Sequence, residues 1–512
     1  MDTMTDGDPR ALLRQLLTIR AEISAEATTQ LEAWQPNILR TEFLPSALNL
    51  AHYLALRRRD LREVQLALMP LGLSSLGRCE SHVLPNLDAV IAALSRAAGE
   101  IEPRPYPTSA QFFAGQAALG AAAEELLGPP PGGRTVRIMA TLPAEAAADP
   151  AYLHRLLLAG ANVVRINCAH DDEATWRAMV ANTRAAAKKL GRTCPVYVDI
   201  AGPKLRVDDV RASGHHIDRG PRVRVGDRVL LGDSDVELSK GFKIALCSSI
   251  PQLVSRVRVG ARVSIDDGKA EARIVDVHHG ALVIEFFQAP AKGLRMRAMR
   301  GLNFPDSELG LPTITDKDKN DLAFIAAEGD MVGYSFVNTP DDVAQLQAEI
   351  ERHPRAAREP LAIVLKIETL SAVRNLPALI VAAASRDPVG VMIARGDLAV
   401  NIGYRRLAEI QEEILWLCES AHIPVIWATQ VLERLVREGQ SSRGEFTDAA
   451  MAERAECVML NKGPYLAEAT VALADVLGRM EGHQTKKTSR LRPLHAWDTS
   501  TVTSSAGLTT AR

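Results

Sequence analysis

The chain has 512 residues, a length that corresponds to about three domains of ordinary size. Its 47% hydrophobic and 24% charged residues exclude wholesale disorder, and its net charge of −2 gives no electrostatic reason to expect a nucleic-acid or membrane-surface partner. No apolar run reaches the roughly 18 residues that a membrane-spanning helix needs, and the N-terminus lacks the features of a secretory signal. The six cysteines form no CxxC pair, so we expect reduced thiols in a cytoplasmic protein.

Residues 1–130 are expected to form a helical N-terminal extension. Two stretches carry apolar residues at intervals of three and four, LLRQLLTIRAEI and NLAHYLALRRRDLREVQLALMPLGL. A Gly/Pro-rich break, GPPPGGR at 128–134, ends the region. No candidate catalytic residue precedes that break, and we interpret the extension as a docking or capping domain.

Eight short apolar runs rich in β-branched residues follow the break, and both faces of each run are apolar, as in buried parallel strands. They begin at residues 135, 161, 194, 330, 361, 389, 423 and 456, so all but one interval is 26 to 34 residues. Amphipathic helical stretches lie between them. Eight near-equal β–α repeats predict an α/β fold, a (β/α)8 TIM barrel over 134–207 and 301–480, in preference to an open doubly wound sheet.

The exceptional interval of 136 residues between the third and fourth runs predicts an inserted domain. Residues 208–300 read as short alternating strands, with DDG at 266–268 and HHG at 278–280 where hairpin turns would lie. We expect a small β-barrel lid on the catalytic rim. The Ser/Thr-rich segment 481–512 is expected to be a mostly disordered tail.

Charged and polar residues stand at the carboxyl ends of the predicted strands, where a (β/α)8 barrel builds its active site. A solvated rim is the simpler explanation for one such residue, but it would have to account for the whole set at once. The set comprises Arg165, Asn167, Asp199, Lys366, Glu368, Arg395, Asp397 and Thr429.

Two carboxylates in this set come from neighbouring strands, Glu368 and Asp397, and can hold Mg²⁺ together with substrate oxygens and water. Arg165 and Lys366 add two positive charges, which suit a transferring phosphoryl group. Gly396 permits close approach to backbone N–H groups that could bind a carboxylate. These residues alone predict a Mg²⁺-dependent enzyme acting on small anionic, phosphorylated substrates.

Seven motifs over about 135–475 resemble the pyruvate kinase family: NVVRINCAH, VDIAGPKLR, LPTITDKDKNDL, SFVNTPDDV, KIE, VMIARGDLAV and PVIWATQVLE. The resemblance implies a (β/α)8 barrel with a β lid after the third strand. It also implies Mg²⁺ or Mn²⁺ as cofactor and transfer of the phosphoryl group of phosphoenolpyruvate to ADP, giving pyruvate and ATP. Self-association into a homo-oligomer is left open.

The resemblance assigns roles to individual residues. Glu368 and Asp397 would bind the metal, Lys366 would stabilise the phosphoryl group in transit, and Arg165 would contact the phosphate. Gly396, Asp397 and Thr429 would hold the three-carbon acid, with Thr429 also on the route of enolate protonation. The positions matching the nucleotide side are Asn167, His170, Arg206, Arg300 and Lys462.

The chain departs from the family pattern mainly on the nucleotide side. TLPAEA replaces the usual T-I-G-P turn after the first strand, NKGPY stands where S-G-E-T-A is usual, and the family's C-terminal domain is not expected. These changes leave two alternatives open. One is a phosphoenolpyruvate- or oxoacid-handling lyase or phosphatase that does not use ADP. The other is a non-catalytic binding module on the same fold.

Three linked substitutions concern a monovalent cation. In K⁺-dependent family members the oxygens of Asn, Ser, Asp and Thr hold the cation, but here Ala169 and Ile200 replace the Ser and the Thr, and only Asn167 and Asp199 remain. Lys204 replaces the Glu of the G-P-E motif, and its ammonium would stand beside Asp199 in place of the ion. The sequence therefore predicts an enzyme that does not require K⁺.

Overall fold

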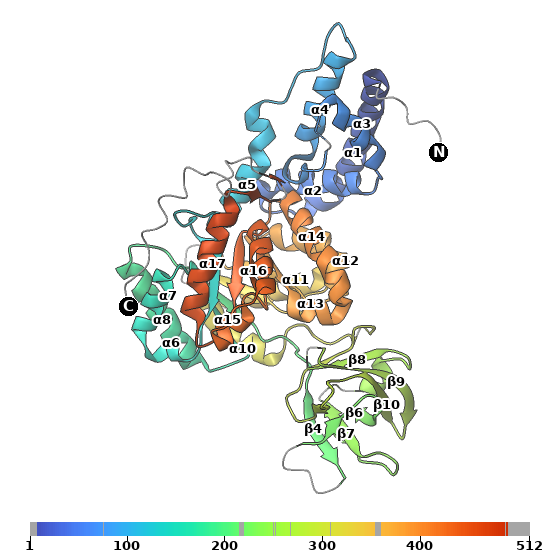
Figure 1. Ribbon diagram of the computed structural model, residues 1–512, viewed down its shortest axis with the longest axis vertical. Coiled ribbons are helices and arrows are strands. Elements are labelled where there is room, and N and C mark those ends of the chain that lie inside the picture. Colours follow the sequence, from blue (N-terminus) through green and yellow to red (C-terminus); the bar gives the residue numbers. More distant parts are fainter. Residues whose placement is uncertain are drawn as a thin grey trace, which may run out of the picture.

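The structure is a computed structural model, and it places an eight-stranded barrel between a group of N-terminal helices and a separate β module (Figure 1). The barrel, the inserted module and the helical extension confirm the predicted fold class. The described residues are 8–489 without 75, 214–219, 249, 251, 267, 308, 354–359 and 487.

The N-terminal region is helical and has its own core. The first helix begins with Asp8, whose carboxylate accepts a hydrogen bond from the N–H of Arg10, and Leu16 and Ile23 on this helix are fully buried. The helices are α1 (Pro9–Trp34), α2 (Leu44–Arg57), α3 (Arg62–Leu68), α4 (Val83–Ala97) and α5 (Ser109–Leu127). Short 3₁₀ turns are η1 (Gln35–Asn37), η2 (Thr41–Phe43), η3 (Met69–Leu71) and η4 (Glu80–His82).

All eight predicted runs are parallel strands of one closed barrel, in the order β1-β17-β16-β15-β14-β13-β3-β2. The strands are β1 (Arg137–Thr141), β2 (Val163–Asn167), β3 (Val196–Asp199), β13 (Met331–Tyr334), β14 (Ala362–Ile367), β15 (Val389–Ala394), β16 (Val425–Ala428) and β17 (Cys457–Leu460).

Helices surround the barrel, and several begin at side-chain caps; Thr339, for example, accepts from the N–H of Asp342 at the start of α11. The helices are α6 (Glu145–Ala148), α7 (Pro150–Leu158), α8 (Glu173–Lys189), α10 (Asp316–Glu328), α11 (Pro340–Glu351), α12 (Leu370–Ala384), α13 (Arg395–Ile402), α14 (Tyr404–Ser420), α15 (Glu433–Glu438), α16 (Arg443–Met451), η6 (Ala452–Arg454) and α17 (Leu466–Glu481).

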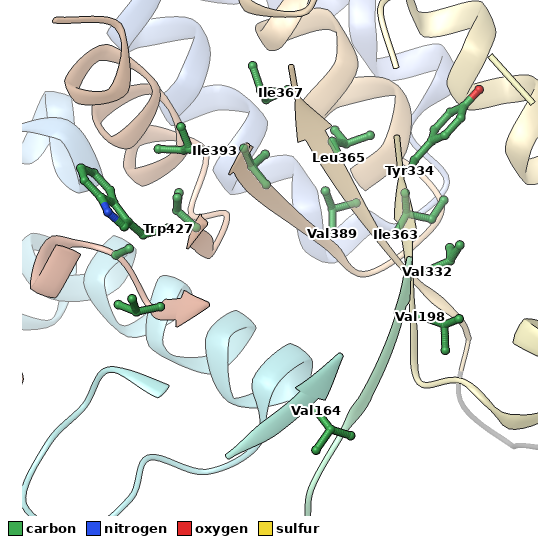
Figure 2. Packing of buried hydrophobic residues seen from close by; sticks show 14 of the residues in the cluster. Val164, Val198, Val332, Tyr334, Ile363, Leu365, Ile367, Val389, Ile393 and Trp427 are labelled. Carbon is green, nitrogen blue, oxygen red and sulfur yellow. The ribbon is translucent and has the colours of Figure 1, made fainter. Parts of the chain in front are cut away.

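Alternate residues of each barrel strand face two different cores. Val164, Val198 and Ile363 point outward into the layer between strands and helices, as Figure 2 shows. Their neighbours fill the barrel interior, where Val364 packs in the same cluster as Leu126 and Leu127 at the end of α5. A helix of the N-terminal extension therefore plugs the barrel at the end opposite its catalytic rim.

Hydrogen bonds hold the N-terminal helices against the barrel. His422, which follows α14, contacts the Ser46 hydroxyl through Nδ1 at 2.8 Å and the Ser81 carbonyl through Nε2 at 3.0 Å. The side-chain amide of Asn49 donates to the carbonyl of Ser420 at 2.8 Å. These buried polar contacts give the extension a defined position on the barrel.

The inserted module is a curled seven-stranded sheet, order β12-β8-β9-β10-β6-β7-β4, with a core of its own. The left-handed backbones of His279 and Gly280 form the predicted turn between β9 and β10. Its elements are β4 (Val207–Ala212), β5 (Arg222–Val223), β6 (Arg228–Gly232), β7 (Ile244–Ser248), α9 (Leu253–Arg256), β8 (Arg262–Ile265), β9 (Ala270–His278), β10 (Ala281–Gln288), β11 (Leu294–Arg295) and β12 (Leu302–Asn303).

The start of the expected disordered tail is folded. β18 (Gln484–Thr485) and β19 (Thr488–Ser489) pair as a hairpin after α17. Lys486 at its tip donates to the carbonyl of Arg454 at 2.9 Å and forms an ion pair with Glu456, which is why this polar segment is held. The expectation of disorder is therefore wrong for the residues of β18 and β19, and 487 and 490–512 lie outside the described residues.

None of the helices in the described ranges combines the length and the apolar character needed to cross a bilayer. All six cysteines are buried as free thiols.

Candidate active site

Lys366 is the centre of a buried group of charges at the carboxyl end of β14. Its Nζ lies 3.0 Å from Oε1 of Glu368 and 3.2 Å from Oδ1 of Asp199, and it donates a hydrogen bond to the Ser335 hydroxyl at 2.6 Å. Lys366 and Glu368 are two residues apart along an extended chain, so both point toward the barrel axis. Neighbouring strands β3 and β13 supply Asp199 and the segment that carries Ser335.

Asp199 receives a second cation from β2. The guanidinium of Arg165 donates through Nε to Oδ2 of Asp199 at 3.2 Å, and its NH1 reaches the Thr141 hydroxyl at 3.1 Å. The phenol of Tyr197 donates to Oδ1 of Asp199 at 3.0 Å. Five adjacent strands, β1, β2, β3, β13 and β14, thus hold the two cations in fixed positions.

The electrostatics of this group keep its members charged. Burial alone would raise the pKa of Asp199, but Lys366 and Arg165 outweigh burial and hold the pKa below its ordinary value. Burial alone would lower the pKa of Lys366, and the Asp199 and Glu368 carboxylates reverse this and raise it. The ammonium of Lys366 therefore persists without solvent.

The pKa of Glu368 is raised, first by burial, and the negative charge of Asp397 adds to the effect despite the opposing charge of Lys366. Two carboxylates that repel each other in a buried site are a fitting place for a divalent cation. Glu368 keeps acceptor capacity for one, since its Oε2 accepts a single backbone N–H, that of Phe336, at 2.6 Å.

Glu368 and Asp397 would be the protein ligands of such an ion. Across the described part of the chain, no group of three or more His, Cys, Asp or Glu side chains is arranged to hold a metal. A two-carboxylate site completed by water and substrate oxygens suits Mg²⁺, which keeps several waters, better than Zn²⁺, which favours closed sets of nitrogen and sulfur ligands.

The ends of β15 and β16 are joined through a backbone N–H. Gly396, in the first turn of α13, donates from its N–H to the hydroxyl of Thr429 at 2.7 Å. Thr429 has a φ of +65°, a left-handed backbone that is strained for a β-branched residue. The N-terminus of α13 and the Thr429 hydroxyl thus present donors side by side, which suits a carboxylate ligand.

Arg395 holds this strained end in place and does not belong to the group around Lys366. Its guanidinium donates to the carbonyls of Ala428 at 3.0 Å and Thr429 at 2.6 Å, and it pairs with Asp448 on α16. It also lies 4.6 Å from the centre of the Trp427 ring. The guanidinium therefore links the carboxyl end of β16 to α16.

Positive charges gather around His170. Burial lowers the pKa of this imidazole, and the nearby charges of Lys462, Arg206 and Arg165 lower it further. Three residues expected on the nucleotide side, His170, Arg206 and Lys462, therefore lie close enough to interact electrostatically, and their charges suit phosphate groups. Asn167, which the resemblance also places on the nucleotide side, accepts the N–H of Ala169 through Oδ1, at 3.0 Å. It shapes the turn after β2.

Arg300, expected on the nucleotide side, is engaged within the inserted module. Its guanidinium forms an ion pair with Asp266, and both side chains are largely buried. The sequence could not show this pairing because the partner lies 34 residues away, in the turn after β8.

A family model for the pyruvate kinase barrel domain matches residues 133–469. The chain belongs to the pyruvate kinase family. The pyruvate kinase of Geobacillus stearothermophilus is 32% identical over 359 residues, covering 68% of this chain and 57% of that relative. Pyruvate kinase 1 of Trypanosoma brucei brucei is 30% identical over 331 residues, covering 63% of each chain.

The fold is also similar to that of solved structures. A crystal structure of a pyruvate kinase from Cryptosporidium parvum has a TM-score of 0.60 and 24% identity, covering 70% of this chain and 72% of that one. At that identity the likeness bears on the fold alone. The chain spans about 57% of the length of the first bacterial relatives that it matches.

Within this pyruvate kinase barrel, Lys204 lies near a different carboxylate from the one expected. Its Nζ is 3.5 Å from Oδ1 of Asp397, the expected metal ligand. The carboxylate of Asp199, where the sequence placed it, is engaged by Arg165 and Lys366. The positive charge of Lys204 therefore lies beside an expected metal ligand and not beside Asp199.

Sequence reasoning missed several residues that build the site. Ser335 and Tyr197 lie within predicted strands, and each offered a signal. Ser335 is a hydroxyl at the end of its run, and Tyr197 stands two residues before Asp199, on the same face of the strand. Asp448 gave no such signal because it lies in the middle of a helix far from any strand end.

Proposed function

We propose that this chain transfers the phosphoryl group of phosphoenolpyruvate to ADP, giving pyruvate and ATP, with Mg²⁺ or Mn²⁺ bound by Glu368 and Asp397. The observation that carries the proposal is the position of Lys366, whose ammonium is buried within 3.3 Å of two carboxylates and beside Arg165. Membership of the family supports the same reaction.

Lys366 and Arg165 supply fixed positive charge where the migrating phosphoryl group develops negative charge. Both cations are held by Asp199, so little reorganisation is needed as the group moves. A bound divalent cation would add Lewis-acid stabilisation of the phosphoryl oxygens and of the enolate oxygen.

The carboxylate of phosphoenolpyruvate would lie at the N-terminus of α13. There it would accept the N–H of Gly396 and the hydroxyl of Thr429, in place of the hydrogen bond that these two groups now make to each other. We also assign to the Thr429 hydroxyl the relay of the proton that converts the enolate to pyruvate. The phosphates of ADP would lie among the cations around His170.

A coupled assay tests the proposal by measuring pyruvate from phosphoenolpyruvate and Mg²⁺, with and without ADP. We expect pyruvate formation that requires ADP and yields ATP in equal amount. Lys366→Met, which keeps the length of the side chain and removes its charge, is the matched control. Pyruvate without ADP would favour a phosphatase or lyase, and the absence of turnover would favour a binding module; either result overturns the proposal.

A further inference from the structure

The phenol of Tyr197 is a polar group in the apolar interior of the barrel. Tyr197 lies on β3, two residues before Asp199, so both side chains point toward the barrel axis. The tyrosine is fully buried in the same cluster as Val364 and Met392, and the Met392 sulfur lies 4.0 Å from the phenol oxygen. A phenylalanine would fill this space without a polar atom that needs a partner, so the presence of the hydroxyl requires an explanation.

Gly333 on the neighbouring strand β13 provides the space for this phenol. It is the register partner of Asp199, and its backbone is that of an ordinary strand, so its conformation does not require glycine. A Cβ at this position would overlap the phenol oxygen of Tyr197 and would lie 2.6 Å from Oδ1 of Asp199. Glycine weakens the interior of a strand, and here the close approach of the phenol accounts for it. The structure therefore keeps this space clear for the phenol and the carboxylate together.

The carboxylate of Asp199 is held by donors from three strands. Its Oδ1 accepts the phenol of Tyr197 at 3.0 Å and lies 3.2 Å from Nζ of Lys366, and its Oδ2 accepts Nε of Arg165 at 3.2 Å. The last torsion of an aspartate side chain is broad, so these donors decide where each oxygen points. Without the phenol, only the two cations would orient the carboxylate, and both cations are also expected to contact the substrate.

The phenol is suited to hold the carboxylate while the cations act. It stands two residues further from the catalytic rim than Asp199, on the same strand and on the same face. Burial, followed by the charge of Asp199, raises the pKa of Tyr197 well above its ordinary value, so the hydroxyl keeps its proton and remains a donor. Its hydrogen bond to Oδ1 is therefore independent of what binds on the rim.

We propose that Tyr197 is a positioning residue for phosphoryl transfer. The phenol fixes the orientation of the Asp199 carboxylate from inside the barrel, and the carboxylate in turn holds Lys366 and Arg165 in line with the migrating group. Tyr197 contacts no substrate in this arrangement and acts only through Asp199. The effect on turnover rests on the proposed function, whereas the effect on the orientation of Asp199 does not.

Kinetics of Tyr197→Phe test the proposal, because this substitution keeps the ring and removes only the hydroxyl. Tyr334→Phe is the matched control. Tyr334 is also fully buried on a barrel strand, but it lies in the layer between strands and helices (Figure 2). Its phenol contacts the Thr313 hydroxyl at 2.6 Å and donates to the carbonyl of Asp342 at 3.1 Å.

We expect kcat to fall about tenfold to a hundredfold in Tyr197→Phe, the factor that corresponds to one hydrogen bond to a charged group. The KM for phosphoenolpyruvate should change less than kcat, because the loss concerns the alignment of Lys366 in the transition state. Tyr334→Phe should lower the melting temperature at least as much as Tyr197→Phe and keep kcat within about twofold of the native value. A purely structural role would affect both variants alike.

Crystal structures of the native protein and of both variants test the geometry without turnover. We expect the Asp199 carboxylate to be rotated, or to occupy two orientations, in Tyr197→Phe alone. An unmoved carboxylate, a kcat of Tyr197→Phe within about twofold of native, or an equal loss of kcat in Tyr334→Phe would each overturn the assignment. A native chain without ADP-dependent turnover would overturn the proposed function and with it the effect on phosphoryl transfer, while the crystal structures would still decide whether Tyr197 orients Asp199.

Discussion

Replacing Arg395 with lysine should lower turnover although Arg395 contacts none of the residues around Lys366. The guanidinium reaches two backbone carbonyls and Asp448 at once, through three nitrogens in one plane. A lysine has one compact ammonium and cannot reproduce this arrangement. Arg395→Lys therefore keeps the charge but releases the end of β16, where Thr429 has its left-handed backbone.

The backbone strain at Thr429 sets the size of the fall in kcat that we expect for Arg395→Lys. A non-glycine residue in the left-handed region costs about 1–3 kcal/mol, and a hydrogen bond from a charged donor contributes about 1.5–3 kcal/mol. The two bonds from Arg395 to the carbonyls of Ala428 and Thr429 therefore outweigh the strain, and without them the strain can relax. A loss of 1–3 kcal/mol corresponds to about 5- to 150-fold in the population with Thr429 correctly placed, and we expect kcat to fall by that factor.

The assay is pyruvate formation at saturating phosphoenolpyruvate, ADP and Mg²⁺, with thermal unfolding measured in parallel. Arg434→Lys is the matched control, because Arg434 forms an exposed i,i+4 pair with Glu438. Asp448→Asn should lower kcat in the same direction as Arg395→Lys, since it weakens the same guanidinium contact. If both variants keep kcat within about twofold of the native value, the strained Thr429 does not depend on Arg395 and the reasoning is wrong.

Four further outcomes are expected. Glu368→Gln and Asp397→Asn should each abolish turnover at saturating Mg²⁺ without lowering the melting temperature; activity near the native level would contradict the metal assignment. Lys366→Met should lower kcat far more than it raises KM for phosphoenolpyruvate, and the reverse pattern would make Lys366 a ground-state binder. Turnover should be complete without K⁺, because Ala169 and Ile200 remove two of the four oxygen ligands that hold the cation in K⁺-dependent relatives; several-fold activation of the native protein by K⁺ would contradict this expectation. Burial lowers the pKa of His52 to about 4, below its unfolded value, so its stabilising effect is complete above about pH 6.5 and is lost as pH falls toward 4. The free energy of unfolding in urea should fall by up to about 1.4 kcal/mol per pH unit in that window, less steeply in His52→Gln.

The barrel could be predicted because its signal is local and repeated. In β14, Ile363 faces the helices and Val364 faces the barrel interior, so both faces are apolar and the run stands out against its polar flanks. The length of chain between two such runs is enough for one helix. Eight repeats of that unit leave few arrangements other than a closed parallel barrel.

It was harder to predict which residues of the candidate site contact each other than which residues belong to the site. A residue at a strand end is certain to lie on the rim, but the direction of a side chain in the following loop depends on distant contacts. The N–H of Gly202 donates to Oδ1 of Asp318 on α10 at 3.2 Å, and the N–H of Lys204 then donates to the Gly202 carbonyl at 2.8 Å. This anchored turn fixes where Lys204 begins, and no local pattern contains that information.

The hairpin of β18 and β19 could not be predicted from the sequence for a related reason. Its residues are polar, and composition alone places such a segment among solvated tails. The segment is held by the ion pair between Lys486 and Glu456, a residue that lies just before β17. A single charged pair between distant segments leaves no periodicity to detect.

The position of Lys204 decides how its charge acts. Beside Asp199 the ammonium would compensate for a missing monovalent ion near the phosphate, and its removal would raise KM for phosphoenolpyruvate. At 3.5 Å from Asp397 it reduces the negative potential that attracts the divalent cation. Lys204→Ala should then lower the Mg²⁺ concentration required for half-maximal activity, because the metal no longer competes with a fixed positive charge. The side chain of Lys204 is 34% exposed, whereas that of Asp199 is only 2% exposed. Asp397 is the more hydrated of the two carboxylates, so a solvated lysine pairs with it at a lower desolvation cost than with Asp199.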